Sequence, residues 1–150
     1  MWEVIFGAVN IIALIGWMTL ILLPRKPLPL TAVLYLGVGL LCLVYTAGLL
    51  ALMSGLADPG PGGLQADFTS LEGIRAIFAT DGGVAVGWTH YLAFDLFTGL
   101  WIARDADAKG FSRLVQAPVL LATLFAGPLG LLVWLVIRER RARLHGRPKR

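Results

Sequence analysis

The chain has 150 residues, of which 57% are hydrophobic and only 15% charged. A soluble domain is about a quarter charged, and one of this size buries only about 60–70% of its surface. The composition therefore excludes an ordinary soluble domain and a disordered tail. A single cysteine, Cys42, also excludes an intrachain disulfide.

Four apolar stretches are each long enough to cross a bilayer, which takes about 20 residues. The first two contain 21 and 31 consecutive residues without Asp, Glu, Lys, Arg or His. The third contains one carboxylate and one histidine, and the fourth contains neither. The pattern predicts an all-α fold, an integral membrane bundle of four transmembrane helices at about 4–23, 30–56, 82–103 and 114–137, which form one domain over residues 1–137.

The ends of these segments carry further signals. The first follows Met1-Trp2-Glu3 rather than a basic leader and is longer than the core of a signal peptide, so we expect it to stay in the mature protein. Prolines at 24 and 27 end it and leave a short turn to the second helix. In the fourth segment Pro128 cannot donate a backbone hydrogen bond, which predicts a kinked helix.

Residues 57–81 form the one substantial segment outside the predicted membrane helices. Pro and Gly residues at 59–63 indicate a turn, and Thr69 followed by Glu72 fits a capping box. Apolar residues then recur at helical spacing on one face, at Leu71, Ile74, Ile77 and Phe78. We predict a short amphipathic helix that either covers the bundle or simply connects two spans.

The C-terminal residues 138–150 form a basic tail with seven Lys or Arg residues and one acid, Glu139. Such a cluster beside a membrane helix indicates contact with anionic lipid headgroups, and nothing in it resembles a nucleic-acid-binding module. Four spans would place both termini and residues 57–81 on one side. The tail favours the cytoplasm for that side, whereas the acidic start favours the opposite. We predict cytoplasmic termini in a bacterial inner membrane.

The predicted helix 82–103 is the only span with a carboxylate or a histidine, and its polar and aromatic residues share one face. At about 100° per residue, this face occupies about half of the circumference and Leu and Ala residues occupy the other half. Because a carboxylate in the membrane is costly, we expect the polar face to point inward. His90 and Asp95 are candidate proton-transfer groups, and the neighbouring candidates for substrate contact are Trp88, Tyr91, Phe94, Thr98 and Trp101.

A purely structural role for His90 and Asp95 is about equally compatible with the sequence. Both side chains could form hydrogen bonds to Asn10, Tyr45 or Thr46 on neighbouring helices and so hold the bundle together. Two histidines and one cysteine cannot form a usual zinc site, and the chain has no phosphate-binding glycine loop. We expect neither a metal nor a cofactor.

The core W-x-H-x-L-x-x-D-L-F at residues 88–97, together with Asp105 and Gly127-Pro128-Leu129-Gly130, resembles a known membrane family. This family consists of small four-helix proteins related to the plant neoxanthin-synthesis protein whose loss causes abscisic acid deficiency. The resemblance covers nearly the whole chain except the basic tail. It implies that Trp88, His90, Asp95 and Asp105 are the matching functional positions, with Asp105 among the substrate contacts.

The resemblance also implies carotenoid conversion, of the type that isomerises an epoxide to an allene. This reaction removes a proton from carbon and delivers one to oxygen, without a redox cofactor. A non-catalytic binder or scaffold for pigment, quinone or a partner enzyme is the alternative. A third hypothesis, a proton or ion pathway, requires a homo-oligomer because one intramembrane carboxylate per chain is too few for a relay.

Overall fold

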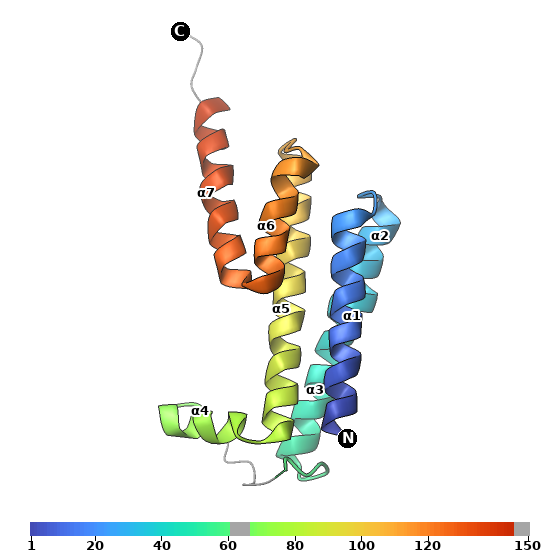
Figure 1. Ribbon diagram of the computed structural model, residues 1–150, viewed down its shortest axis with the longest axis vertical. Coiled ribbons are helices and arrows are strands. Elements are labelled where there is room, and N and C mark those ends of the chain that lie inside the picture. The colour runs from blue at the N-terminus through green and yellow to red at the C-terminus, as the bar shows by residue number, and fades with distance from the viewer. Residues whose placement is uncertain (61–66, 146–150) are drawn as a thin grey trace.

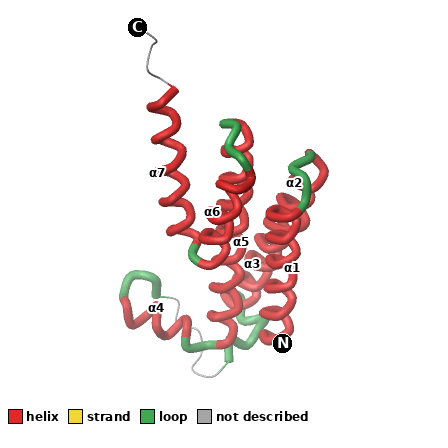
Figure 2. Tube along the Cα trace, turned by 45° about the horizontal axis from the view of Figure 1, so that its top comes forward, coloured by secondary structure: helices red, strands yellow, loops and turns green. Residues whose placement is uncertain are grey.

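The computed structural model describes residues 1–60 and 67–145, with side chains up to residue 139. All regular secondary structure in these residues is helical, and loops connect the helices (Figure 2). This confirms the all-α prediction. The elements are α1 (Trp2–Leu22), α2 (Pro27–Ala32), the π-helix η1 (Val33–Gly39), α3 (Leu40–Met53), α4 (Leu71–Phe78), α5 (Asp81–Ala108), α6 (Arg113–Phe125) and α7 (Gly127–His145).

The first two predicted helices are confirmed to within three residues at each end. α1 runs up the long axis of the molecule, and α2, η1 and α3 return as one continuous rod from Pro27 to Met53 (Figure 1). Pro27 and Pro29 lie in the first turn of α2, where their missing N–H groups have no helical partner to lose. These prolines therefore start the second helix as well as separating it from the first.

Helix α4 lies across the lower end of the molecule and confirms the predicted short helix (Figure 1). Its N-cap is Ser70, whose Oγ accepts the Gly73 N–H at 3.0 Å, so the predicted capping box at Thr69 is wrong by one residue. Asp67 explains the difference, because its carboxylate accepts hydrogen bonds from both the backbone N–H and the hydroxyl of Thr69. It also accepts the Ser70 hydroxyl.

Acidification is expected to loosen the start of α4. The hydrogen bonds from Ser70 and Thr69 lower the pKa of Asp67 to about 2, so this carboxylate stabilises the fold above its ordinary pKa near 4. That contribution is lost as the pH falls from about 4 to about 2. Hydrogen exchange of the α4 amides, corrected for intrinsic rates, should accelerate over this range in the wild type. The variant Asp67→Asn should show no such step, and an identical step in both proteins would contradict the assignment.

The fourth predicted helix, 114–137, is wrong as a single kinked span. Ala126 leaves the helical conformation with φ −154° and ψ 82°, and α6 and α7 form a hairpin in which α7 runs back along α6 (Figure 1). Pro128 has no N–H to continue α6, and it fits the first turn of a new helix. The proline signal was therefore correct in position, but it reverses the chain instead of bending it.

This hairpin places the end of α7 far from the start of α1. The start of α1 lies at the lower end and α7 finishes at the upper end, so the prediction that both ends share one side does not agree with the fold (Figure 1). Most of the predicted basic tail lies outside the residues whose side chains are described.

Two described helices are long and apolar enough to cross a membrane, Trp2–Leu22 and Pro27–Met53. They indicate association with a membrane, but four transmembrane helices are not confirmed.

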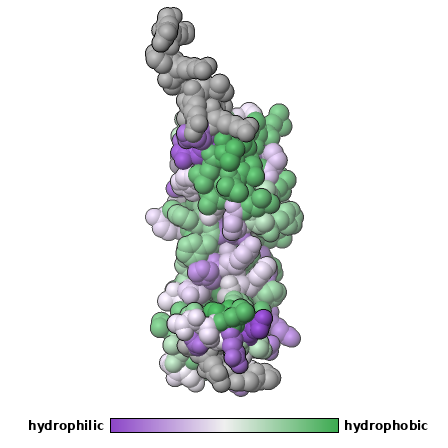
Figure 3. All heavy atoms as spheres, turned by 90° about the vertical axis from the view of Figure 1, so that its left-hand side faces the viewer, coloured by the Kyte–Doolittle hydropathy of each residue, from purple (hydrophilic) through white to green (hydrophobic). Residues whose placement is uncertain are grey.

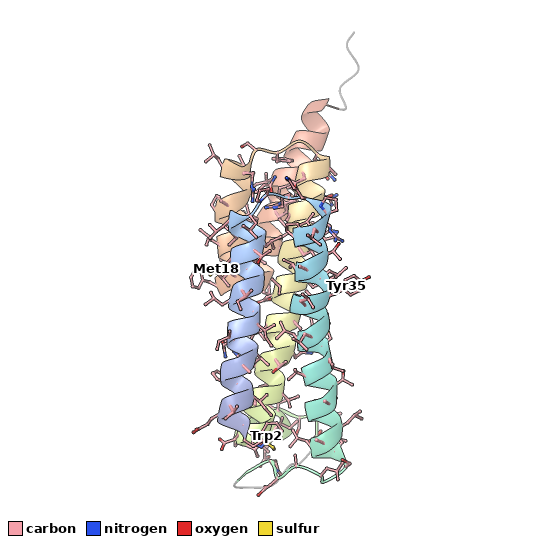
Figure 4. All side chains as sticks on the ribbon, turned by 90° about the vertical axis from the view of Figure 1, so that its right-hand side faces the viewer. Trp2, Met18 and Tyr35 are labelled. Carbon is pink, nitrogen blue, oxygen red and sulfur yellow. The ribbon has the colours of Figure 1, made fainter. Side chains whose placement is uncertain are left out.

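The core is formed where α1 and η1 pack against the middle and upper part of α5. Trp17, Leu20, Leu96 and Leu100 are almost completely buried there. Gly99 permits this contact, because a Cβ atom at its position would overlap the Trp17 ring. Other parts of these helices carry exposed side chains, as Met18 of α1 and Tyr35 of η1 illustrate by extending outward (Figure 4).

Candidate ligand groove

An apolar cavity of about 240 Å³ lies between α3, α4 and the beginning of α5. Leu49 and Met53 of α3, Phe68 and Phe78 at α4, and Val86 of α5 are among its lining residues. The amphipathic helix α4 forms one wall, since Ile74 and Ile77 of its apolar face also line the cavity. This observation favours the covering role of α4 over that of a simple connector.

A second cavity of about 400 Å³ continues along the same pair of helices. It lies between η1 and α5 and is lined by Leu34, Tyr35, Val38, Gly39, Cys42, Ala93, Phe94 and Phe97. We call the two cavities together the seam groove. Along α5 the groove extends from Gly83 to Phe97, which corresponds to roughly 21 Å at 1.5 Å per residue.

His90 lies where the two cavities meet. Its imidazole lines the lower cavity, and its ring centroid is 5.3 Å from that of Tyr45 and 4.7 Å from that of Phe94, which lines the upper cavity. The side chain is exposed, and these ring contacts are its interactions within the described part of the chain. The predicted functional histidine is thus placed halfway along an apolar groove.

Asp95 points to a different part of the molecule. Its side chain is buried against the α6–α7 turn, where the backbone amide of Gly127 interacts with the carboxylate. The positive end of the α7 dipole favours a carboxylate at this position. Oδ2 is buried and forms no hydrogen bond within the described residues. The structure therefore does not bring Asp95 and His90 together around one cavity.

The prediction that the polar-aromatic face of this helix points inward is wrong. Phe94 and Phe97 are 58% and 48% exposed, whereas Leu96 and Leu100 are almost completely buried. In lipid, aromatic side chains can face outward at little cost, and helices pack closely through small and aliphatic residues. Asp95 is buried although its aromatic neighbours are not, because the α6–α7 turn covers it.

The other predicted contact residues are distributed over several places. Trp88 donates from Nε1 to Asn10 Oδ1 at 3.1 Å and stacks on Tyr91 with a ring separation of 5.5 Å. Trp101 lies 5.5 Å from the Arg138 guanidinium, and Thr98 is half-buried. Of the predicted substrate contacts, only Phe94 lines the groove with His90.

Asp105 belongs to a polar cluster at the upper end of the molecule. Its carboxylate accepts the Trp134 indole N–H at 3.0 Å and forms ion pairs with Lys109 and, at 2.9 Å, with Arg138. A second cluster joins Arg25 to Asp107 at 3.1 Å and to the completely buried Gln116 at 2.8 Å. These contacts join the α1–α2 turn to α5 and α6, and α5 to α7.

Removal of the Asp105 carboxylate is expected to destabilise the fold. The variant Asp105→Ala leaves the N–H of Trp134, a residue with 0% exposure, without its acceptor, which should cost about 1–3 kcal/mol. Thermal unfolding in detergent measures the loss. In a Trp134→Phe background the same change should cost less, because the donor is absent. A wild-type melting temperature with lost ligand binding would instead support the predicted substrate contact.

The sequence-based analysis missed the half of the groove that the second helix contributes. Tyr35, Cys42 and Leu49 recur every seven residues, and Val38, Tyr45 and Leu52 follow the same period three positions later. This heptad pattern is typical of a helix that faces a partner along a seam. It could have identified the groove wall before the structure was known.

Comparisons with known proteins bear on this geometry. No curated protein and no solved structure matches the chain. A family model described as "ABA DEFICIENT 4-like" matches residues 4–134, which include most of α1, the second helical rod, α4, α5, α6 and the first turns of α7. This match covers both walls of the seam groove and the Asp95–Gly127 contact. The chain therefore belongs to the ABA DEFICIENT 4-like family.

Proposed function

We propose that this protein is a multi-pass membrane protein that binds a long isoprenoid, specifically a carotenoid, in the seam groove and isomerises it. Membership in the ABA DEFICIENT 4-like family supports a relation to neoxanthin synthesis. The single observation that carries the proposal is the alignment of two apolar cavities along α5 with His90 at their junction. The bacterial inner membrane remains the expected location.

The lining of the groove fits a ligand that is apolar over most of its length. Aliphatic and aromatic side chains line both cavities, and the polar groups are few: the Tyr45 hydroxyl and His90 imidazole near the junction, and Tyr35 and Cys42 in the upper part. Ligand sites of this kind take their affinity from apolar surface and their orientation from a few polar groups. A polyene with an oxygen-bearing end group has this distribution.

The chemistry assigned to His90 is proton transfer during epoxide isomerisation. A proton leaves the polyene carbon bonded to the epoxide-bearing ring, and its C–H electrons form a new C=C bond to the ring carbon. The C–O bond of the epoxide at that ring carbon breaks and the oxygen gains a proton, so the allene forms and atoms and electrons balance without an oxidant. A neutral imidazole can accept the first proton and return it to the oxygen. Because Asp95 faces the α6–α7 turn, the proposal rests on His90, and a catalytic role for Asp95 stays a prediction.

A conversion assay tests this proposal. The protein, purified in detergent, is incubated with violaxanthin, and the pigments are separated by chromatography. The variant His90→Ala should lose about 10²–10⁴-fold in rate, the usual contribution of a positioned acid or base. His145→Ala removes the other histidine of the chain and should convert pigment normally. Conversion by His90→Ala at the wild-type rate would contradict the assigned role.

A non-catalytic pigment carrier is the second candidate. One observation favours it: within the described residues His90 has aromatic neighbours but no hydrogen-bonding group that orients the ring as a base. Catalytic bases are usually oriented by such a group. In the same assay a carrier would retain violaxanthin unchanged, and His90→Ala would alter only its affinity.

A further inference from the structure

The charged residues are distributed unequally between the two ends of the molecule. Five acidic residues and a single basic one, Arg75, lie at the lower end, around the start of α1, α4 and the start of α5. The acids are Glu3, Asp58, Asp67, Glu72 and Asp81. Basic residues outnumber acidic ones at the upper end, around the α1–α2 turn and the α5–α6 turn, where Asp105 and Asp107 are accompanied by five bases: Arg25, Lys26, Arg104, Lys109 and Arg113.

The α6–α7 hairpin adds the end of α7 to this basic side. Arg138 of α7 forms an ion pair with Asp105 near the end of α5, which fixes the two helix ends side by side. Arg140, Arg141 and Arg143 follow on the last turns of α7. If 114–137 crossed the membrane, these arginines would lie with the acidic end instead. The reversal of the chain at Ala126 is therefore what makes the asymmetry so strong.

We infer that the upper end faces the cytoplasm, where its basic surface contacts anionic lipid headgroups, and that the N-terminus and α4 lie on the opposite side. This orientation rests on the membrane insertion that is part of the proposed function. Lys and Arg near helix ends set the orientation of membrane proteins, and they are retained on the cytoplasmic side. Anionic lipids of the cytoplasmic leaflet attract the same residues.

Under this arrangement α1, the rod Pro27–Met53 and α5 each cross the membrane once. The α6–α7 hairpin enters and leaves from the cytoplasmic side, and its turn is held at membrane depth by the contact between Gly127 and Asp95. A broken helix at this depth is tolerated where protein covers it. Figure 3 shows hydrophobic side chains gathered on the upper part of the face that this hairpin presents. The acidic start of α1 then lies on the side away from the cytoplasm and the basic α1–α2 turn lies on the cytoplasmic side, so both predict the same orientation as the rest of the chain.

Cysteine accessibility tests the orientation. Cys42 is the only cysteine, so Cys42→Ala provides a background without thiols. Ser54→Cys places a thiol just after α3 at the lower end, and Ser112→Cys is a matched change just before α6 at the upper end. Both serines are exposed. In spheroplasts, a membrane-impermeant maleimide should label Ser54→Cys fully and Ser112→Cys only after lysis. The reverse pattern would overturn the inference.

The number of crossings needs a second pair of positions. Glu3→Cys and a cysteine appended after Arg150 should label on opposite sides of the membrane, whereas labelling on the same side would overturn the three-crossing arrangement. Should Ser112→Cys fail to accumulate, Ala108→Cys marks the same end. Reversed labelling of a protein that stays in the membrane fraction would contradict only the orientation. Recovery in the soluble fraction would contradict the proposed function as well.

Discussion

The variant Gly127→Ala is expected to destabilise the protein strongly. A Cβ atom at this position would overlap the Asp95 carboxylate, which is itself buried. Neither group can move easily, because Gly127 begins α7 directly after the turn at Ala126. Overpacking of this kind costs about 1–3 kcal/mol, and more where the backbone must shift. Thermal unfolding in detergent should show the loss directly.

The matched control for this change is Gly7→Ala. Gly7 is an exposed helical glycine on α1, and a Cβ atom there would meet nothing within 4 Å. Its replacement by alanine should leave the stability unchanged or raise it slightly. In an Asp95→Ala background the cost of Gly127→Ala should fall, because the atoms that collide are absent. Equal costs with and without Asp95 would contradict the proposed contact.

Filling the upper part of the groove is expected to abolish most pigment binding. Gly39 lines this cavity, and a Cβ atom there would approach only the Leu34 carbonyl oxygen, at 3.4 Å, so the variant Gly39→Leu should fold. The added side chain would occupy space that the polyene needs. We expect affinity to fall at least about tenfold, equivalent to about 1.4 kcal/mol. The amount of bound pigment is measured from its absorbance when it co-elutes with the detergent-purified protein.

The corresponding control is Gly7→Leu, which adds the same side chain on α1, outside the groove. It should retain pigment at the wild-type level. Equal retention by Gly39→Leu and Gly7→Leu would show that the ligand lies elsewhere. Equal loss in both variants would point to a general effect on the bundle.

Helix content and most helix positions could be predicted from the sequence because they depend on local signals. Uninterrupted apolar runs define α1 and the rod Pro27–Met53, and proline at 27 marks the start of the latter. The amphipathic period of residues 71–78 identifies α4. Each of these features is contained within a few helical turns, so no knowledge of distant contacts is needed.

The α6–α7 hairpin could not be predicted in the same way. Hydropathy is equally high on both sides of Ala126, so the run 114–137 has the composition of one membrane span. What reverses the chain is a combination of Pro128, the absent side chain at Gly127 and the carboxylate of Asp95 on another helix. The last of these is a tertiary contact between residues 32 positions apart. A pattern within one segment does not contain it.

The candidate site was predicted only in part for a related reason. His90 is a candidate because of its chemistry, and its functional role stays a prediction. Which face of α5 turns inward depends on where Trp17 and the other side chains of α1 find room. In a membrane both faces can be apolar, so polarity does not decide the question. Tyr45 and the other residues of the second helix became visible as groove lining only when the two helices were placed together.

The most direct test of the account uses the chain's only thiol as a reporter of groove occupancy. Cys42 is exposed and lines the upper cavity of the seam groove. Intact-mass measurement of the rate at which a small maleimide modifies Cys42, with and without added xanthophyll, reports directly on the groove. We predict that the pigment slows modification in the wild type and has no such effect in Gly39→Leu. An unchanged rate in wild-type protein that demonstrably carries pigment would contradict the central claim.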